Sequence, residues 1–261
     1  MRSGHFCFLN QMDEVAAAGY DTAELHIREI MELDDAGFRA ARKQTLDCGI
    51  HCEVFNNPLP MDIQINGEGF DLAYYTEFMK RGIGRIAELG GRYVNFGNGR
   101  ARHIPEGTGK EEAAQRNLNV LNTLCGLAAA ADLTVLLEPI GISITNYVTT
   151  ITEAVDIIHQ VDFPNLKALV DYRWQLAEGR PLSELADFKD SIAHIHVDYP
   201  FSVLPVRVEP TVEDGHDYKP FFDVLQEIGY SGIVSIEALT FSDFPNEIRR
   251  GIELLDLHGI V

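Results

Sequence analysis

Short apolar runs alternate with longer amphipathic stretches along the whole chain. The short runs are rich in β-branched and aromatic residues, a composition typical of buried strands. They lie at residues 5–10, 22–26, 50–55, 93–96, 135–138, 168–171, 192–196 and 233–237. Because helical patterns separate them, we predict parallel strands joined by right-handed crossovers. Eight strand–helix units are the number that closes a (β/α)8 barrel, so an α/β fold of this kind is our expectation.

Two of the intervening stretches show the three-to-four-residue spacing of an amphipathic helix. The apolar positions are Leu72, Tyr75, Met79, Ile83 and Ile86 in the first, and Ala114, Leu118, Leu121, Cys125 and Ala128 in the second. The pairs Thr108/Glu111 and Thr150/Glu153 have the spacing of a capping box. Glycines at 90 and 229 follow amphipathic stretches, where we expect helices to end.

Length and composition favour one soluble domain spanning residues 1–261. The chain carries 21 Lys and Arg against 40 Asp and Glu, so its formal charge is −19. That balance argues against nucleic-acid partners and against an anionic membrane surface, which both attract clustered positive charge. The sequence shows no membrane span or signal peptide, and its four cysteines lack metal-site spacing. We therefore expect reduced thiols and a cytoplasmic protein, and leave open whether it forms a homo-oligomer.

Four consecutive predicted strands, the fifth to the eighth, end in an ionisable residue. The stretches TVLLEP, ALVD, IAHIHVD and IVSIEAL place Glu138, Asp171, His196 and Glu237 at or near these ends. In a barrel the carboxyl ends of the strands form one face, so we expect the four side chains to converge. A charge directly after a buried strand is costly to desolvate, and three clustered carboxylates repel one another. A divalent cation among them would offset both costs, so the sequence predicts a metal site.

The expected donors are three carboxylates and one imidazole. Such a set suits Mn²⁺, Mg²⁺ or Co²⁺ better than a structural zinc, which favours Cys and His. Mn²⁺ is our first expectation, with Mg²⁺, Co²⁺ and Zn²⁺ as alternatives. A single acidic residue after a strand is more often a helix cap or a solvated loop residue, so the prediction depends on the whole set.

Several stretches of the chain resemble the sugar phosphate isomerase/epimerase family. They are LLEP, LVDY, IAHIHVD, GYSGIVSIEAL, AELGGRYVNFGNGRARHIPEG and TNYVTTITEA. That family comprises the xylose isomerase-like TIM barrels and includes ketose 3-epimerases, hydroxypyruvate isomerase and inosose dehydratase. The resemblance implies metal ligands at Glu138, Asp171, His196 and Glu237. It also implies that Glu138 and Glu237 act as the acid/base pair of an isomerase or epimerase. The implied substrate is a sugar or sugar-like keto compound, which would react through an enediolate.

The chain departs from this resemblance at several polar positions. Where relatives often place Asn-Arg and then a second Glu, this chain has Gly141, Ile142 and Ile144. Trp174 stands where relatives often have a substrate-binding His, and Ser202 where they usually have an Arg. The pattern indicates a substrate with a less polar portion, which Trp174 would stack against or cover.

Further candidates for substrate contact come from other predicted strands and loops. Asn146 either orients its loop or binds substrate. Arg100 lies in GNGRAR, which is more typical of a loop with salt-bridging arginines than of a phosphate cradle, because it lacks a Walker lysine. His51 and Glu53 alternate inward on the third predicted strand, where a buried hydrogen bond is the plainer interpretation of His51.

Three ionisable residues near the predicted site have two interpretations each. Glu24 and His26 end the second predicted strand and face substrate, or they form a surface ion pair or a capped loop. His194 shares a face of the seventh predicted strand with His196 but lies deeper, and is either a core histidine or one that orients a ligand carboxylate.

Three other functions remain as alternatives to the isomerase. A metal-dependent lyase would use the same enediolate to expel water or a glycosidic group. A catalytically silent barrel would serve as a binding or accessory subunit. A DNA-repair endonuclease shares the barrel but requires further metal-binding His and Glu residues and a basic groove, which this sequence does not show.

Overall fold

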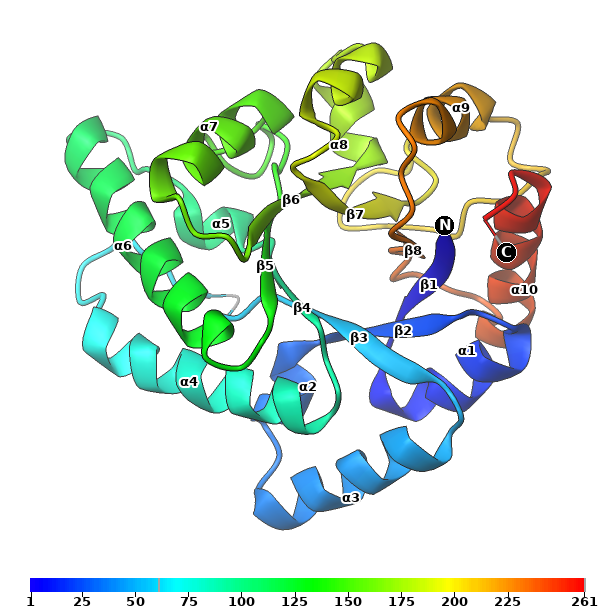
Figure 1. Ribbon diagram of the computed structural model, residues 1–261, viewed down its shortest axis with the longest axis horizontal. Coiled ribbons are helices and arrows are strands. Elements are labelled where there is room, and N and C mark those ends of the chain that lie inside the picture. The colour runs from blue at the N-terminus through cyan, green and yellow to red at the C-terminus, as the bar shows by residue number, and fades with distance from the viewer. Residues whose placement is uncertain (61, 261) are drawn as a thin grey trace.

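Eight parallel strands form a closed barrel surrounded by helices in the computed structural model, which describes residues 1–60 and 62–260 (Figure 1). The strand order follows the chain from β1 to β8, and β8 pairs with β1 to close the sheet. The strands are β1 (Arg2–Cys7), β2 (Thr22–His26), β3 (His51–Asn56), β4 (Tyr93–Phe96), β5 (Thr134–Leu137), β6 (Leu166–Asp171), β7 (Ile192–Val197) and β8 (Ile233–Ile236). The predicted barrel is therefore confirmed.

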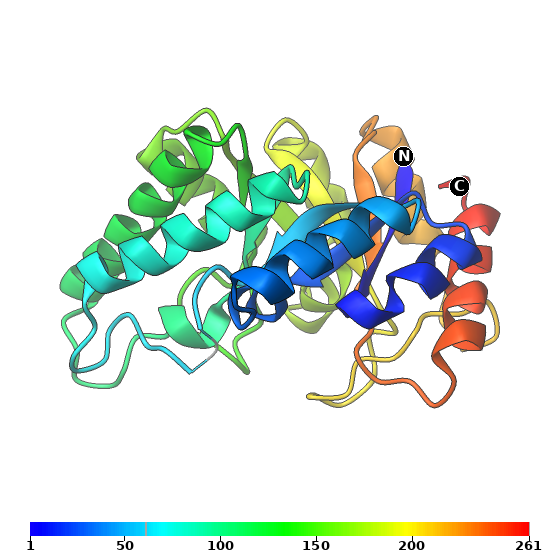
Figure 2. The same ribbon diagram turned by 90° about the horizontal axis from the view of Figure 1, so that it is seen from below.

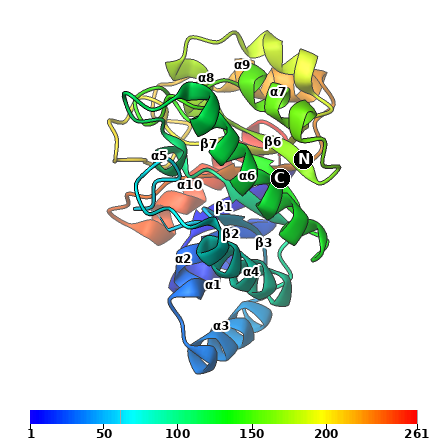
Figure 3. The same cartoon turned by 90° about the vertical axis from the view of Figure 1, so that its left-hand side faces the viewer.

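Helices cover the outside of the barrel and connect each strand to the next. They are α1 (Met12–Ala18), α2 (Ile27–Met31), α3 (Asp35–Asp47), α4 (Leu72–Glu88), α5 (Gly99–Arg102), α6 (Lys110–Ala129), α7 (Ile151–Val161), α8 (Tyr172–Ala177), α9 (Lys219–Glu227) and α10 (Phe244–Leu257). Two 3₁₀ turns occupy Leu9–Gln11 and Leu182–Phe188. The two predicted apolar stripes lie on α4 and α6, which pack side by side (Figure 3).

Helix boundaries agree with the predicted signals at three of four places. The Thr150 hydroxyl accepts a hydrogen bond from the Glu153 N–H and caps α7. Gly90 and Gly229 have φ values of +82° and +69° after α4 and α9, a conformation that favours glycine. The cap predicted at Thr108 is wrong, because α6 begins after Gly109 and no side chain caps it.

The barrel interior changes from apolar to polar along its axis. Val54, Leu136, Leu169 and Ile233 form a small apolar cluster separate from the main core between sheet and helices. Toward the carboxyl ends of the strands the buried side chains are polar. The loops on that side include residues 198–218, the yellow segment that projects at the bottom of Figure 2. This end of the barrel therefore offers the setting for a polar site.

The sequence predicts reduced thiols and no membrane-spanning segment. All four cysteines are free, and three of them are buried. Within the described residues, no helix combines the length and apolar character that crossing a bilayer requires.

Candidate metal centre

The last four strands bring four ionisable side chains to one point. Glu138 directly follows β5, Asp171 ends β6, His196 lies in β7, and Glu237 directly follows β8. Each offers one ligand atom, and these atoms all lie within 4.8 Å of one another. Glu138, Asp171 and His196 are buried, whereas Glu237 is partly exposed to the cavity above. The structure thus gathers the four residues that the sequence singled out.

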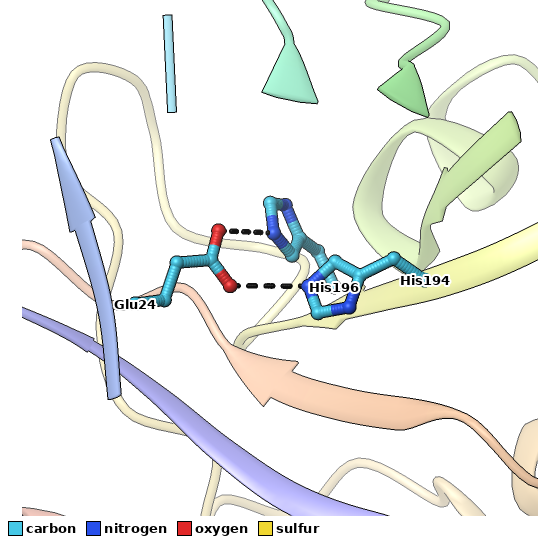
Figure 4. Close-up of side chains that lie close together, drawn as sticks. All are labelled: Glu24, His194 and His196. Atoms are coloured by element: carbon cyan, nitrogen blue, oxygen red, sulfur yellow. Dashed lines mark hydrogen bonds and ion pairs between the residues drawn. The ribbon is translucent and has the colours of Figure 1, made fainter. Parts of the chain in front are cut away.

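A fourth carboxylate, Glu24 of β2, contacts the imidazole of His196 on the side away from the other three (Figure 4). Its two oxygens divide between two rings: Oε1 lies 2.8 Å from His196 Nε2, and Oε2 lies 3.0 Å from His194 Nε2. All three side chains are fully buried. With Nε2 engaged by Glu24, the other ring nitrogen of His196 faces Glu138 and Glu237. Glu24 forms neither the surface ion pair nor the capped loop that was one of its two interpretations, because its carboxylate lies in the barrel interior.

Two asparagines connect Glu24 to the first proposed ligand. Asn56 donates a hydrogen bond to Glu24, and Asn95 donates to the Asn56 side-chain oxygen at 2.7 Å. Asn95 also donates to Glu138 Oε2 at 2.6 Å. The sequence analysis missed both asparagines, although each lies in or at the end of a predicted strand. Asn56 directly follows an apolar run, the same signal that identified Glu138, whereas Asn95 lies within its run and is followed by Phe96.

A guanidinium also reaches the cluster, and it corrects an expectation. Ser202 in place of a family Arg suggested a site without this cation. Arg207, five residues further along the same loop, lies 2.8 Å from Asp171 Oδ2 and 2.9 Å from Glu237 Oε2. Its Nε donates to Asp198 Oδ2 at 3.0 Å. The family position at Ser202 did not predict this arginine, because the loop carries it at residue 207.

The electrostatics of the cluster fit a divalent cation. Burial raises the pKa of Glu138 against the opposing effect of His196, and the neighbouring carboxylates of Glu237 and Asp171 raise it further. His196 Nδ1 lies 3.1 Å from Glu237 Oε2 and 3.8 Å from Glu138 Oε1, and among the described residues it makes no hydrogen bond of good geometry. A buried imidazole nitrogen without a hydrogen bond, facing three carboxylates, is a donor set suited to Mn²⁺ or a similar cation. A carboxylate behind the ring, as here, is a common way to orient such a ligand.

A cavity of about 430 Å³ opens above the cluster. Glu138, Glu237 and Arg207 reach it from below, and Trp174 and Arg100, two of the residues predicted to contact substrate, line its walls. Asn146 does not line this cavity. Its amide accepts from the Ile104 N–H and donates to the Ile104 carbonyl, so its geometry matches the loop-orienting alternative.

The structure does not bring His51 and Glu53 to the cavity. His51 is exposed, and the buried Glu53 carboxylate pairs with Arg2 and Arg92. These arginines begin β1 and precede β4, so the three charges lie at the amino-terminal end of the barrel. Glu53 is buried, as the predicted inward alternation requires, whereas His51 is exposed, so the buried hydrogen bond expected of His51 is wrong.

The glycine-rich loop after β4 packs against Glu138. A side chain at Gly97 would begin 2.3 Å from Glu138 Oε2, so the close approach requires glycine. Arg102 is fully buried and donates to the Glu138 carbonyl at 2.7 Å. The expected salt-bridging role therefore does not describe Arg102, whose partner is backbone.

Comparison with known proteins places this geometry in a family. A family model described as "Xylose isomerase-like TIM barrel" matches residues 12–258. A putative hydroxypyruvate isomerase from Homo sapiens is 27% identical over 219 residues, covering 79% of this chain and 75% of that protein. One from Xenopus laevis is 32% identical over 131 residues, covering 49% and 45%.

Solved structures agree on the fold. A D-psicose 3-epimerase crystallised in the presence of D-fructose superposes with a TM-score of 0.84 at 17% identity, covering all of both chains. A 3-keto-D-glucoside 4-epimerase from E. coli superposes with a TM-score of 0.79 at 18% identity, covering 98% of this chain and 99% of that one.

Proposed function

The chain belongs to the xylose isomerase-like TIM-barrel family, and we propose that it is a divalent-metal-dependent isomerase or epimerase of a sugar or sugar-like keto compound. The observation that carries the proposal is the convergence of Glu138, Asp171, His196 and Glu237 within 4.8 Å beneath an open cavity. Relatives named for isomerisation and epimerisation support the reaction class.

Four side chains would hold the cation: Glu138, Asp171, His196 and Glu237. When bound, a divalent cation supplies Lewis-acid polarisation of the substrate carbonyl. Mn²⁺ is the ion we propose first, on the oxygen-rich donor set.

Glu138 and Glu237 are the proposed acid/base pair because both carboxylates line the cavity. One removes the proton next to the carbonyl and gives an enediolate, and the other returns a proton to the opposite face or to the adjacent carbon. Burial and neighbouring carboxylates raise the pKa of Glu138, which suits a group that must hold a proton during turnover. Burial alone would raise the pKa of Glu237, but Arg207, which contacts this carboxylate, and His196 outweigh burial and lower the pKa.

Exchange of substrate protons with deuterated solvent tests the proposal directly. We expect Mn²⁺-loaded protein to wash deuterium into at least one member of a panel containing hydroxypyruvate, D-fructose, D-psicose and a 3-keto-glucoside. Glu138→Gln and Glu237→Gln should each slow exchange by about 10²-fold or more, the usual contribution of positioned proton transfer. The matched control is Glu227→Gln on the exposed surface of α9, which should exchange normally. No exchange on any substrate by metal-loaded protein would refute the proposal.

A further inference from the structure

The cavity above the cluster has two unlike walls. The segments that end β2, β3 and β4 contribute polar groups, including His26, Asn56, Asn95 and Arg100. The opposite arc, formed after β5 to β8 and at the end of β1, contributes Glu138, Arg207 and Glu237 at the floor of the cavity, and its other lining side chains are apolar. Its side chains include Phe8, Ile140, Ile144, Trp174, Leu204 and Leu239.

The apolar wall continues from the cavity to the surface. Trp174 is 7% exposed, whereas Phe8 and Leu239 are 37% and 40% exposed at the mouth. Ile142, in the loop after β5, is 71% exposed. Most exposed large apolar side chains of the described residues lie on loops at this end of the barrel: Phe8, Ile142, Phe201, Val203, Val206, Val212 and Leu239. Scattered single apolar residues are ordinary, but Phe8 and Leu239 continue the apolar lining of the cavity to the surface, as is typical of a binding surface.

An unsubstituted sugar fits only one of these walls well. Hydroxyl groups placed against the apolar arc would lose water without gaining hydrogen bonds, which is unfavourable. An apolar group along the same arc would instead bury apolar surface on both sides. The volume of about 430 Å³ lies within the range of pockets that enclose ligands larger than a triose.

Building on the proposed function, we infer that the substrate is a keto-sugar carrying an apolar substituent of roughly phenyl size. Its polyhydroxy portion faces the polar wall and the four proposed ligands. Its substituent lies along Trp174, Leu204 and Leu239 toward Phe8 at the mouth.

Trp174 provides a binding signal that does not depend on turnover, because it is the single tryptophan of the chain. Fluorescence excited at a wavelength selective for tryptophan is titrated with methyl and benzyl β-D-glucopyranoside, two glycosides without a ketone. We expect the benzyl compound to bind about tenfold more tightly, the effect of burying an aromatic group. Equal affinities, or no response to the benzyl compound, would overturn the inference.

Substitutions in the apolar wall test where the substituent lies. Phe8→Ser and Leu239→Ser should each reduce the benzyl-to-methyl affinity ratio by about threefold or more, because each removes apolar surface. The control is Val212→Ser, an exposed apolar residue on the loop between β7 and α9 that does not line the cavity. A ratio unchanged in both wall variants would also overturn the inference.

The two proposals fail separately. Preference for the benzyl glycoside without deuterium exchange on any keto-sugar would refute the proposed reaction but leave the binding inference standing. Exchange on D-fructose or hydroxypyruvate with no preference for the benzyl glycoside would support the reaction and refute the apolar substituent.

Discussion

The carboxylate of Glu24 fixes the orientation of the His196 ring. Glu24 Oε1 contacts His196 Nε2 (Figure 4). The second ring nitrogen of His196 therefore faces Glu138 and Glu237. Burial alone would raise the pKa of Glu24, but the two imidazoles outweigh it and hold that pKa well below its ordinary value. Glu24 is therefore ionised in the barrel interior and accepts hydrogen bonds from both rings.

Replacing Glu24 by glutamine tests this positioning role. A glutamine keeps the shape but offers one oxygen and one NH₂ group, so it cannot accept from both imidazoles. We expect Glu24→Gln to weaken Mn²⁺ binding by about 10- to 100-fold, the usual effect of losing a partner behind a metal ligand. Calorimetric titration of metal-free protein measures it.

The control for this variant is Glu29→Gln. Glu29 is partly buried and accepts a hydrogen bond from the Leu9 N–H, away from the cluster. It should bind Mn²⁺ as the unaltered protein does. If Glu24→Gln binds equally well, Glu24 has no role in presenting His196.

At this scale the sequence shows which residues end strands but not which side chains meet. Glu138, Asp171 and Glu237 could be predicted because each closes an apolar run. Glu24 meets His194 and His196 only because β2 and β7 face each other across the barrel. Its partners are 170 and 172 residues away, and no local pattern encodes that contact.

Among the structural elements, the loop from β7 to α9 is tied to the barrel wall by Glu209. Its carboxylate contacts His5 Nε2 at 3.0 Å on β1 and accepts from the Tyr20 hydroxyl at 3.3 Å. The α10 helix approaches so closely that a side chain at Gly251 would begin 1.7 Å from Glu209 Oε1. Since Arg207 lies two residues earlier, this anchor holds the guanidinium over Asp171 and Glu237.

Removing the anchor should affect both stability and the site. We expect Glu209→Ala to lower the free energy of unfolding by about 1–3 kcal/mol, because buried polar groups lose their partner. It should also raise KM for any substrate found by the exchange assay, because Arg207 loses its support. Urea denaturation and steady-state kinetics measure the two effects.

Glu213→Ala provides the matched control on the same loop. Glu213 is exposed, so its loss should change neither quantity appreciably. An unaltered KM in a destabilised Glu209→Ala protein would show that the anchor does not act through Arg207.

The opposite end of the barrel carries a charge cluster with a defined pH dependence. Burial would raise the pKa of Glu53, but Arg2 and Arg92 outweigh it and lower that pKa below 4.5. A carboxylate with a lowered pKa stabilises the folded state above its unfolded value, and that stabilisation disappears as the pH falls through the folded value.

At pH 7 the free energy of unfolding of Glu53→Gln should therefore be about 1 kcal/mol lower than that of the parent. The effect is modest because Arg2 and Arg92, the partners of Glu53, are partly solvated. The difference should shrink below pH 4.5. Urea unfolding at pH 7 and at pH 3.5 measures it, with the exposed Glu77→Gln as control. A difference that grows in acid would contradict the assigned sign.

Strand positions could be predicted closely, and the largest error has a local cause. The prediction for β1 covered residues 5–10, but the strand runs from Arg2 to Cys7. It ends there because residues 9–11 form a 3₁₀ turn that leads into α1. Apolar character continues through Phe8 and Leu9, so hydrophobicity alone does not show where the strand ends. Phe8 instead reaches the cavity mouth.

For the whole molecule, closure of the sheet joins the two ends of the chain. Arg2 of β1 lies in register with Ile233 of β8, and α1 packs against α10. A barrel completed only when the last strand pairs with the first gains little from partial folding. We propose that residues 1–261 form one cooperative domain, which predicts a single calorimetric transition.

The proposed cation links this whole-molecule stability to the site. Its four ligands come from four different strands, β5 to β8 and the residues that follow them, so an ion binds the closed barrel and not the unfolded chain. Ligand present at 100 times its dissociation constant stabilises a folded protein by about 2.7 kcal/mol. For a chain of this size, that corresponds to a rise in Tm of about 5–10 °C.

Scanning calorimetry of EDTA-treated protein, with and without added Mn²⁺, measures this rise. Asp171→Asn provides the comparison, because it removes one carboxylate from the centre and should lose most of the response while still unfolding in one transition. A surface variant such as Glu227→Gln should keep the full response. Because ions bound loosely by the −19 surface would stabilise both variants alike, equal shifts in the two would show that Mn²⁺ acts outside the centre.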